Sequence, residues 1–349
     1  MPRAGDRTRT PRAGDRAMKR LALIVAACLG GLTAIYLVFY IGIGPVMSAI
    51  ASLGWSGFAL LCAMGTALFA LLSLAWFVLM PDGKSASWLT FFWGRAVRDS
   101  AAEVLPLSQI GGFVIGARAI ILRGVSTADA YGSTVVDVTT EMLAQILFVV
   151  MGVILLVRHL GFHSLHSELF GPLLIGPVLA ALGAAGFIVV QRKGPAFAES
   201  MMARLFPQAV RHAGAFARAI SAIYASPGRI VASVAIHFVG WMATALMSWI
   251  VVRLIGGHVS YMSMVAIESA LSAIRSAAVL VPSAMGVQEA TYAMLMPLFG
   301  VSSAIGLALS LLKRALNIAI GVPVLLSWQG LEGRHALAIE TREERLSGH

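Results

Sequence analysis

No charged side chain occurs between residues 21 and 81, and most residues in this stretch are apolar. An apolar run of about 20 residues is long enough to cross the roughly 30 Å hydrocarbon layer of a membrane as a helix. Over the whole chain, 58% of the residues are apolar and 12% are charged, whereas a soluble domain carries about 25% charged residues. The sequence therefore predicts an all-α integral membrane protein.

Six segments are long and apolar enough to form spanning helices. Lys and Arg collect in cytoplasmic loops, and here they gather at the N-terminus, in the 191–229 loop and in the C-terminal tail. This asymmetry predicts a multi-pass protein of the bacterial inner membrane with both termini in the cytoplasm. It also explains the net charge of +10 without nucleic acid as a partner. The expected spans are 21–41, 55–80, 128–157, 172–191, 229–255 and 302–328.

The N-terminal end of the chain differs from its middle. Residues 1–17 contain the hexapeptide PRAGDR twice, and such a polar segment with Gly and Pro cannot bury enough apolar surface to fold. We expect a disordered basic tail at 1–17, one membrane domain at 18–330 and a cytoplasmic tail at 331–349.

Two further apolar segments, 86–123 and 262–300, are interrupted by Pro, Gly and charged residues. In the first, Pro106 precedes a Gly-Val-Ser sequence that begins at Gly124, and in the second, Pro282 precedes one that begins at Gly300. The step in numbering from Pro106 to Pro282 equals the step from Gly124 to Gly300, and we call it the repeat offset. It is about half the length of the chain. We interpret this pattern as an internal duplication, with repeat one at 18–157 and repeat two at 172–330.

Three expected spans separate the two interrupted segments. Because this number is odd, the equivalent segments would enter the membrane from opposite sides, which makes the repeats inverted. Each segment would form a Pro- and Gly-broken, re-entrant helical hairpin, and the two hairpins would meet near the middle of the membrane. Irregular backbone at that depth is tolerated only inside protein or beside a water-filled cavity. The alternative is that each segment forms two ordinary short spans kinked at the proline.

Ionisable residues inside apolar segments are the candidates for function. A charge at a helix centre costs about 2.5–3.5 kcal/mol and persists only when it is paired or faces water. Asp137 and Glu141 are four positions apart and share a helix face. Asp137 is equivalent to Lys313 under the repeat offset, so we predict that these opposite charges meet near the pseudo-two-fold axis. The alternative is that such residues are packing pairs that fix helix register.

Beside the two prolines, Arg98, Arg275 and Glu289 are expected to bind the polar end of a substrate. Backbone groups freed where the helices break could add hydrogen bonds to it. The candidate pathway residues are Arg98, Pro106, Ser108, Gln109, Gly111, Gly112, Asp137, Glu141, Arg275, Pro282, Gly286, Glu289 and Lys313.

Several kinds of chemistry lack their sequence signatures. Neither a Walker A run nor a nucleophile elbow occurs, so we expect neither ATP hydrolysis nor acyl transfer. The two cysteines, Cys28 and Cys62, lie in apolar runs and the eight histidines are scattered. We therefore expect no metal site, no cofactor and no enzymatic activity.

The interrupted segments also carry a family resemblance. Residues 93–126, 133–145 and 281–300 resemble the flippase-like membrane family that includes the transmembrane half of lysylphosphatidylglycerol synthases. The similarity extends over most of 18–330 and is greatest to the hopanoid-transporter branch. Pro282, Gly286 and Glu289 match the family's Pro-x-x-x-Gly-x-x-Glu pattern.

The chain departs from many of these relatives after its first proline. Where they have an Arg-bearing loop that ends in Gly-Glu, this chain has the uncharged segment 108–113. The difference suits a lipid less charged than an aminoacyl-phospholipid. We also expect no soluble aminoacyl-transfer domain of the kind that the synthases have, so lysyl transfer is not implied.

The resemblance implies lipid transport, with a hopanoid or another polycyclic or isoprenoid lipid moved from the inner towards the outer membrane. In this mechanism Asp137, Glu141 and Lys313 exchange partners between inward- and outward-open states. Two alternatives are a membrane-embedded enzyme that modifies a lipid head group and an accessory subunit of a lipid-synthesis complex. A second copy of the chain or lipid-synthesis proteins would then be its protein partners.

Overall fold

The computed structural model describes residues 36, 39, 43–81, 87–104, 108–160, 213–278 and 284–347, except for the side chains of 108, 109, 160, 213 and 335–347. This part of the chain contains nine α-helices, one 3-10 helix and no β-strand, in agreement with the predicted all-α class. The helices are α2 (Ile43–Val78), α3 (Trp88–Val104), α4 (Ser108–Ile121), α5 (Thr127–Leu160), α8 (Ala213–Tyr224), α9 (Pro227–Leu254), α10 (Tyr261–Ala277), α11 (Val287–Leu295), the 3-10 helix η4 (Met296–Phe299) and α12 (Ser303–Ser347).

Four of the described helices are long and apolar enough to cross a membrane. The crossing segments are Ile43–Val78, Thr127–His159, Pro227–Leu254 and Ser303–Arg334, and they match four of the expected spans. The other two expected spans, 21–41 and 172–191, lie outside the described residues, as does the tail at 1–17. The chain is therefore a multi-pass membrane protein, and the count of six spans stays a prediction.

Helix α2 begins earlier than the sequence suggested. The expected connection at 42–54 is helical from Ile43, and the helix bends at Gly54, where φ is +62° and ψ is 178°. Side chains with a Cβ rarely adopt this conformation, so glycine allows the change of direction. Val46 and Leu53 in the first part of α2 are buried, so this part packs against the protein.

Each interrupted segment forms a pair of helices in place of one span. Segment 86–123 gives α3 and α4, and segment 262–300 gives α10 and α11, which continues into η4. Proline removes a backbone N–H and clashes with the preceding turn, which explains why a helix ends a few residues before each proline. Pro106 and Pro282 themselves lie outside the described residues.

The two Gly-Val-Ser segments form the same turn in the two halves of the chain. Gly124 and Gly300 both have positive φ, +93° and +76°. In both turns the N–H of the glycine donates to the carbonyl three positions earlier, and the N–H of the following valine donates to the carbonyl five positions earlier. Helix α5 then begins at Thr127 and α12 at Ser303, positions that are again related by the repeat offset. The predicted offset therefore extends to backbone hydrogen bonds.

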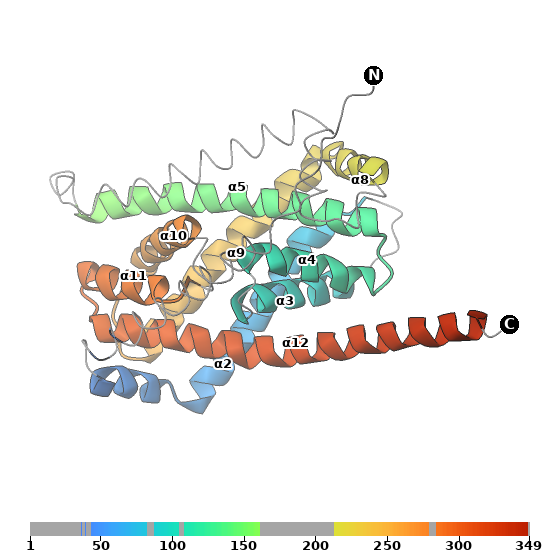
Figure 1. The fold of residues 1–349 in the computed structure, drawn as a ribbon. Coiled ribbons are helices and arrows are strands. Elements are labelled where there is room, and N and C mark those ends of the chain that lie inside the picture. The colour runs from blue at the N-terminus through green and yellow to red at the C-terminus, as the bar shows by residue number, and fades with distance from the viewer. Residues whose placement is uncertain are drawn as a thin grey trace, which may run out of the picture.

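The long helices enclose the short ones. Helices α5 and α12 lie along opposite edges of the bundle and run in opposite directions, while α2 and α9 cross between them (Figure 1). The α3–α4 pair lies on one side of this crossing and the α10–α11 pair on the other (Figure 1). Helix α3 packs on α12, and α10 packs on α5. Each broken segment is therefore held by the long helix of the other half of the chain.

Apolar contacts fix the short helices in place. Tyr292 of α11 and Leu307 of α12 belong to a buried cluster that also draws on α2, α9 and α10. Trp76 of α2 packs edge-on against Phe91 of α3, with ring centroids 5.3 Å apart. Helix α8 packs on α5 through its buried residue Phe216, which contacts Tyr131 and Ala117.

Candidate functional site

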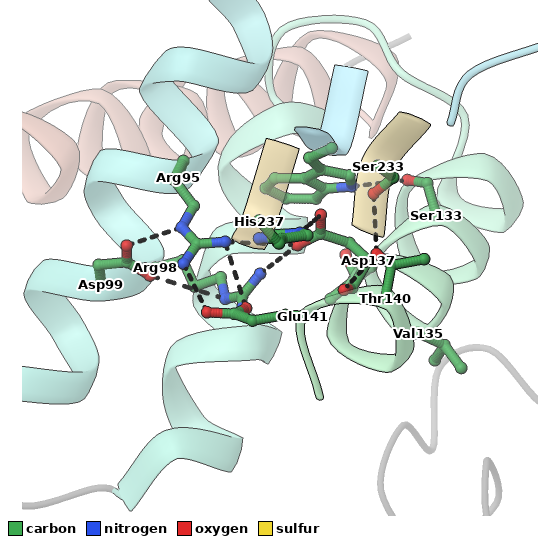
Figure 2. Close-up of polar contacts among 12 residues, drawn as sticks. Arg95, Arg98, Asp99, Ser133, Val135, Asp137, Thr140, Glu141, Ser233 and His237 are labelled. Carbon is green, nitrogen blue, oxygen red and sulfur yellow. Dashed lines mark hydrogen bonds and ion pairs between the residues drawn. The ribbon is translucent and has the colours of Figure 1, made fainter. Parts of the chain in front are cut away.

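Three helices bring six ionisable side chains together inside the bundle, and we call them the arginine cluster. Helix α3 contributes Arg95, Arg98 and Asp99, helix α5 contributes Asp137 and Glu141, and helix α9 contributes His237 (Figure 2). The side chains of Asp137 and His237 are both 0% exposed. Charged groups this deep in an apolar protein persist only when they are paired.

The pairing in the arginine cluster is dense. Arg98 donates to Asp137 Oδ2 and to Glu141 Oε2, both at 2.5 Å. Arg95 donates to Glu141 Oε1 at 2.9 Å and to Asp99 Oδ2 at 2.7 Å. His237 Nε2 lies 3.0 Å from Asp137 Oδ1 (Figure 2). Guanidinium groups match carboxylates with several N–H donors at once, so two arginines hold three acids from two helices.

Two glycines of α4 allow this helix to pack closely against α3 at Arg98. A Cβ added at Gly112 would lie 2.6 Å from the carbonyl oxygen of Arg98, and one at Gly116 would lie 2.6 Å from Arg98 Cβ. Only a residue without a side chain permits such a close approach. The ring of Phe113, between the two glycines, faces the Arg98 guanidinium with 4.5 Å from its centroid to Cζ. Helix α4 therefore packs tightly on α3 and covers Arg98.

The second half of the chain carries its own buried cluster, the lysine cluster, made of Ser248, Glu268, Tyr292 and Lys313. Lys313 Nζ donates to Glu268 Oε1 at 3.0 Å, to Tyr292 Oη at 2.9 Å and to Ser248 Oγ at 3.2 Å. Tyr292 Oη donates to Glu268 Oε1 at 2.5 Å. The side chains of Lys313 and Glu268 are 13% and 5% exposed.

The prediction that Asp137 meets Lys313 is wrong. Asp137 is bound by Arg98 and His237, and Lys313 is bound by Glu268. Each of the two equivalent residues lies on the long helix of its half and has an oppositely charged partner on a short helix of the same half. Asp137 is also contacted by His237, which comes from α9 of the other half. Residues related by a two-fold axis meet only when they lie close to that axis, and a partner in the same half compensates the charge without this condition.

An ion pair joins the two halves next to the breaks in their short helices. Glu103, in the last turn of α3, accepts from Arg275 Nη2 of α10 at 2.6 Å and from Asn317 Nδ2 of α12 at 3.2 Å. Arg275 also donates to Gln288 Oε1 of α11 at 3.3 Å. The side chains of Arg275 and Glu103 are 27% and 22% exposed, so this pair is accessible while Asp137 and His237 are not.

Glu289 occupies the N-terminus of α11. Its Oε2 accepts from the N–H of Gly286 at 2.8 Å, and its Oε1 accepts from Ser310 Oγ at 3.0 Å. The Arg314 guanidinium donates to both carboxylate oxygens. This is a capping arrangement in which a carboxylate satisfies a helix N-terminal N–H group. Backbone groups were expected to be free for a substrate where the helices break, and at Gly286 the N–H is instead bound by Glu289.

Only some of the predicted site residues lie together in the structure. Arg98, Asp137 and Glu141 lie together, whereas Arg275 and Glu289 lie in separate contacts, joined through Gln288 and Ser310. Gly112 is a packing residue inside α4 and not a helix end, while Gly111 is in the first turn of α4. The predictions that fall outside the described residues or side chains concern Pro106, Ser108, Gln109 and Pro282.

Sequence reasoning left several residues out of the predicted site. Arg95, Glu268 and Arg314 were recognisable as ionisable residues inside apolar segments, but the sequence did not indicate their partners. His237 went unnoticed among scattered histidines, although it lies within the expected span 229–255. Its position was the available signal, since an ionisable residue inside a span is a candidate for function.

A metal ion has little room in the arginine cluster. One ligand-type atom from each of Asp137, Glu141 and His237 lies within 4.8 Å of the other two. However, all four oxygens of the two acids already accept hydrogen bonds from Arg95, Arg98 or His237. A divalent cation would also lie beside two guanidinium groups. The donor chemistry of these three residues therefore suits ion pairing better than metal binding.

Comparison with known families gives one clear result. Residues 21–324 match the family described as the lysylphosphatidylglycerol synthase TM region. Searches of curated proteins and of solved structures found no match. Because the family match covers most of the chain, and the described residues include four helices long and apolar enough to cross a membrane, the protein belongs to the lysylphosphatidylglycerol synthase TM-region family.

Proposed function

We propose that this protein moves a lipid across or out of the bacterial inner membrane, and that the lipid is a hopanoid or a related polycyclic or isoprenoid lipid. The family indicates a membrane lipid-related function. Both termini would lie in the cytoplasm, where the basic loops place them. The hopanoid assignment is supported by the uncharged segment 108–113, which offers no cation to an anionic head group.

The observation that carries the proposal is the ion pair between Glu103 and Arg275. It links the two halves of the chain beside both breaks, at a place where the side chains are partly accessible. A transporter of this kind would bind substrate where broken helices from two repeats meet. Arg275 and Arg314, both partly exposed, would contact the polar end of the lipid.

Two inverted halves would provide the motion. Helices α5 and α12 begin at positions related by the repeat offset and run in opposite directions (Figure 1). In our proposal α2–α5 and α9–α12 are inverted repeats, and rocking of one against the other opens the site to each side in turn. The lysine cluster would move as a rigid part of α9–α12, since its side chains all come from these helices and bind one another. The arginine cluster reaches from one half to the other, because His237 of α9 binds Asp137 of α5.

The proposal is tested by the distribution of lipids between the two membranes of the cell. Inner and outer membranes are analysed in cells with the wild-type protein, without it, and with Glu103→Gln. We expect unchanged lipid species, an outer membrane depleted of hopanoid without the protein, and partial depletion with Glu103→Gln. Arg118→Gln is the matched control, because it also breaks a partly exposed ion pair, the one with Glu332.

Other outcomes would point to the alternatives. A lipid species that disappears without the protein, while its precursor accumulates, would identify an enzyme. If every lipid species kept its amount and distribution in all strains, a transport role would be refuted and an accessory role favoured.

A further inference from the structure

The arginine cluster has one more acid than it has permanent bases. Asp99, Asp137 and Glu141 carry carboxylates, and only Arg95 and Arg98 bring guanidinium groups to them among the described residues. The cluster therefore has a net charge of −1 when His237 is neutral and is balanced when the imidazole is charged. An unbalanced charge is costly inside a membrane protein, so the cluster is suited to hold one more positive charge.

The contacts of His237 indicate that the additional positive charge is a proton on Nδ1 of its imidazole ring. Its Nε2 lies 3.0 Å from Asp137 Oδ1, and an ionised carboxylate only accepts hydrogen bonds, so Nε2 carries a hydrogen in both charge states. A further proton must then bind at Nδ1. Nδ1 is buried and has no hydrogen-bond partner among the described residues, and an unsatisfied buried polar atom calls for an explanation.

The other members of the cluster are poorer proton acceptors. Each oxygen of Asp137 and Glu141 already accepts from an N–H of Arg95, Arg98 or His237. A proton on one of these oxygens would turn an acceptor into a donor that faces another donor. Asp99 Oδ2 accepts from Arg95, and Asp99 Oδ1 lies 3.7 Å from Arg98 Nε, so protonation of Asp99 would weaken its ion pairs with both arginines. Nδ1 of His237 can take up a proton without breaking a recorded contact.

The charged groups around His237 come from two helices. Helix α5 brings Asp137 and Glu141, and helix α3 reaches the same acids with Arg95 and Arg98. The other helices packed on α9 supply no charged contact to His237 among the described residues. Other charged side chains of the surrounding helices are exposed or have partners of their own. Arg218 of α8 and Arg158 and His159 of α5 are exposed, and Asp129 of α5 binds Ser126. Glu268 binds Lys313, Arg275 binds Glu103, Arg314 binds Glu289, and Arg118 binds Glu332.

We propose that His237 binds an exchangeable proton at Nδ1, and that this proton moves through the protein in exchange for the lipid. The proton site stands on the contacts of the arginine cluster alone, whereas the coupling rests on the proposed lipid transport. With the proton bound, the cluster is neutral and holds α3, α5 and α9 together. When the proton leaves, the buried negative charge favours separation of these helices, which provides a link between proton release and opening.

The proton site is tested by nuclear magnetic resonance on the protein labelled with ¹⁵N in its histidine rings and held in lipid nanodiscs. The His237 signals are those that are lost in His237→Gln and that a water-soluble paramagnetic reagent fails to broaden. We expect to find Nδ1 both unprotonated and protonated over the pH range in which the protein stays folded. A ring that stays neutral, or stays charged, over this whole range would refute the proton site.

Coupling is tested with the wild-type protein, His237→Gln and His258→Gln in vesicles that contain a hopanoid. Glutamine retains an N–H donor for Asp137 but cannot take up a proton, and His258 is an exposed histidine bound to Arg253. We expect reversal of an imposed pH gradient to change the rate of lipid movement severalfold in the wild type and in His258→Gln, and to have no effect in His237→Gln.

The outcomes separate the two parts of the proposal. If the wild type moves lipid at the same rate under both gradients, the coupling is wrong, and the resonance experiment still decides on the proton site. If the wild type moves no lipid under any condition, the proposed transport fails, and the proton site is again judged by the ring signals of the wild-type protein alone.

Discussion

Separating Lys313 from Glu268 should reveal how strongly the lysine cluster stabilises the second half of the chain. In Lys313→Met, the Glu268 carboxylate loses contacts of 3.0 and 3.2 Å and keeps only the Tyr292 hydroxyl among its recorded partners. Its side chain is 5% exposed, so water replaces little of the loss. Removal of one partner from a buried pair costs about 3–5 kcal/mol, and we expect this loss in the free energy of unfolding.

The double variant Glu268→Gln/Lys313→Met tests the reasoning. Replacing both partners of a buried pair is often close to neutral, so the double variant should be more stable than either single variant. The free energy of unfolding is measured in mixed detergent micelles for the wild type, Lys313→Met, Glu268→Gln and the double variant. Simple addition of the two single losses would show that the pair does not interact and would refute the assigned contact.

Two control pairs of residues, tested by the same set of single and double variants, show how large the coupling between Glu268 and Lys313 is. Arg118 and Glu332 form an ion pair whose side chains are 36% and 35% exposed, and such a pair contributes about 0–1 kcal/mol. Asp137 and Lys313 belong to different clusters, so the losses in the free energy of unfolding caused by Asp137→Asn and Lys313→Met should add to within about 0.5 kcal/mol in the double variant. A large coupling between Asp137 and Lys313 would contradict the observed partners.

Two further predictions concern packing and topology. Gly112→Ala should destabilise the protein and weaken binding of Arg98 to its acids, because the new Cβ would meet the Arg98 carbonyl oxygen at 2.6 Å. In the control Gly330→Ala the new Cβ meets nothing within 4 Å, so its stability should be unchanged or rise by up to about 1 kcal/mol from helix propensity. The free energies of unfolding of both variants measure the difference. Cysteines placed at Gly44 and His258 should react with an impermeant thiol reagent added outside sealed cells, while one at Ala213 should not, and labelling at Ala213 would overturn the orientation inferred from the basic loops.

The sequence predicted the helices well because their physical signals are local. Long apolar runs marked four spans that the structure contains, and a proline with a Gly-Val-Ser turn marked each broken segment. Gly124 and Gly300 have positive φ, a conformation that glycine adopts readily, and the glycines are visible in the sequence. Such features depend on neighbours in sequence, so no knowledge of packing was needed.

The partners of the charged residues depend on packing and could not be read in the same way. Asp137 binds Arg98 and His237, which lie on two other helices far from it in sequence. The repeat offset related Asp137 to Lys313, but equivalence in a repeat does not imply contact. The role of Gly112 was missed for the same reason, since its closeness to Arg98 exists only after α4 packs on α3.

Because Glu103 and Arg275 have opposite charges, their ion pair favours docking of the first half on the second half but not docking of either half on a copy of itself. Under the repeat offset the counterpart of Arg275 is Asp99. Two copies of the first half that docked in the same manner would therefore place Glu103 against Asp99, and two acids repel each other. Halves produced as separate polypeptides should accordingly recombine as unlike partners, and a gene that lost its second half could not be rescued by self-association of the first.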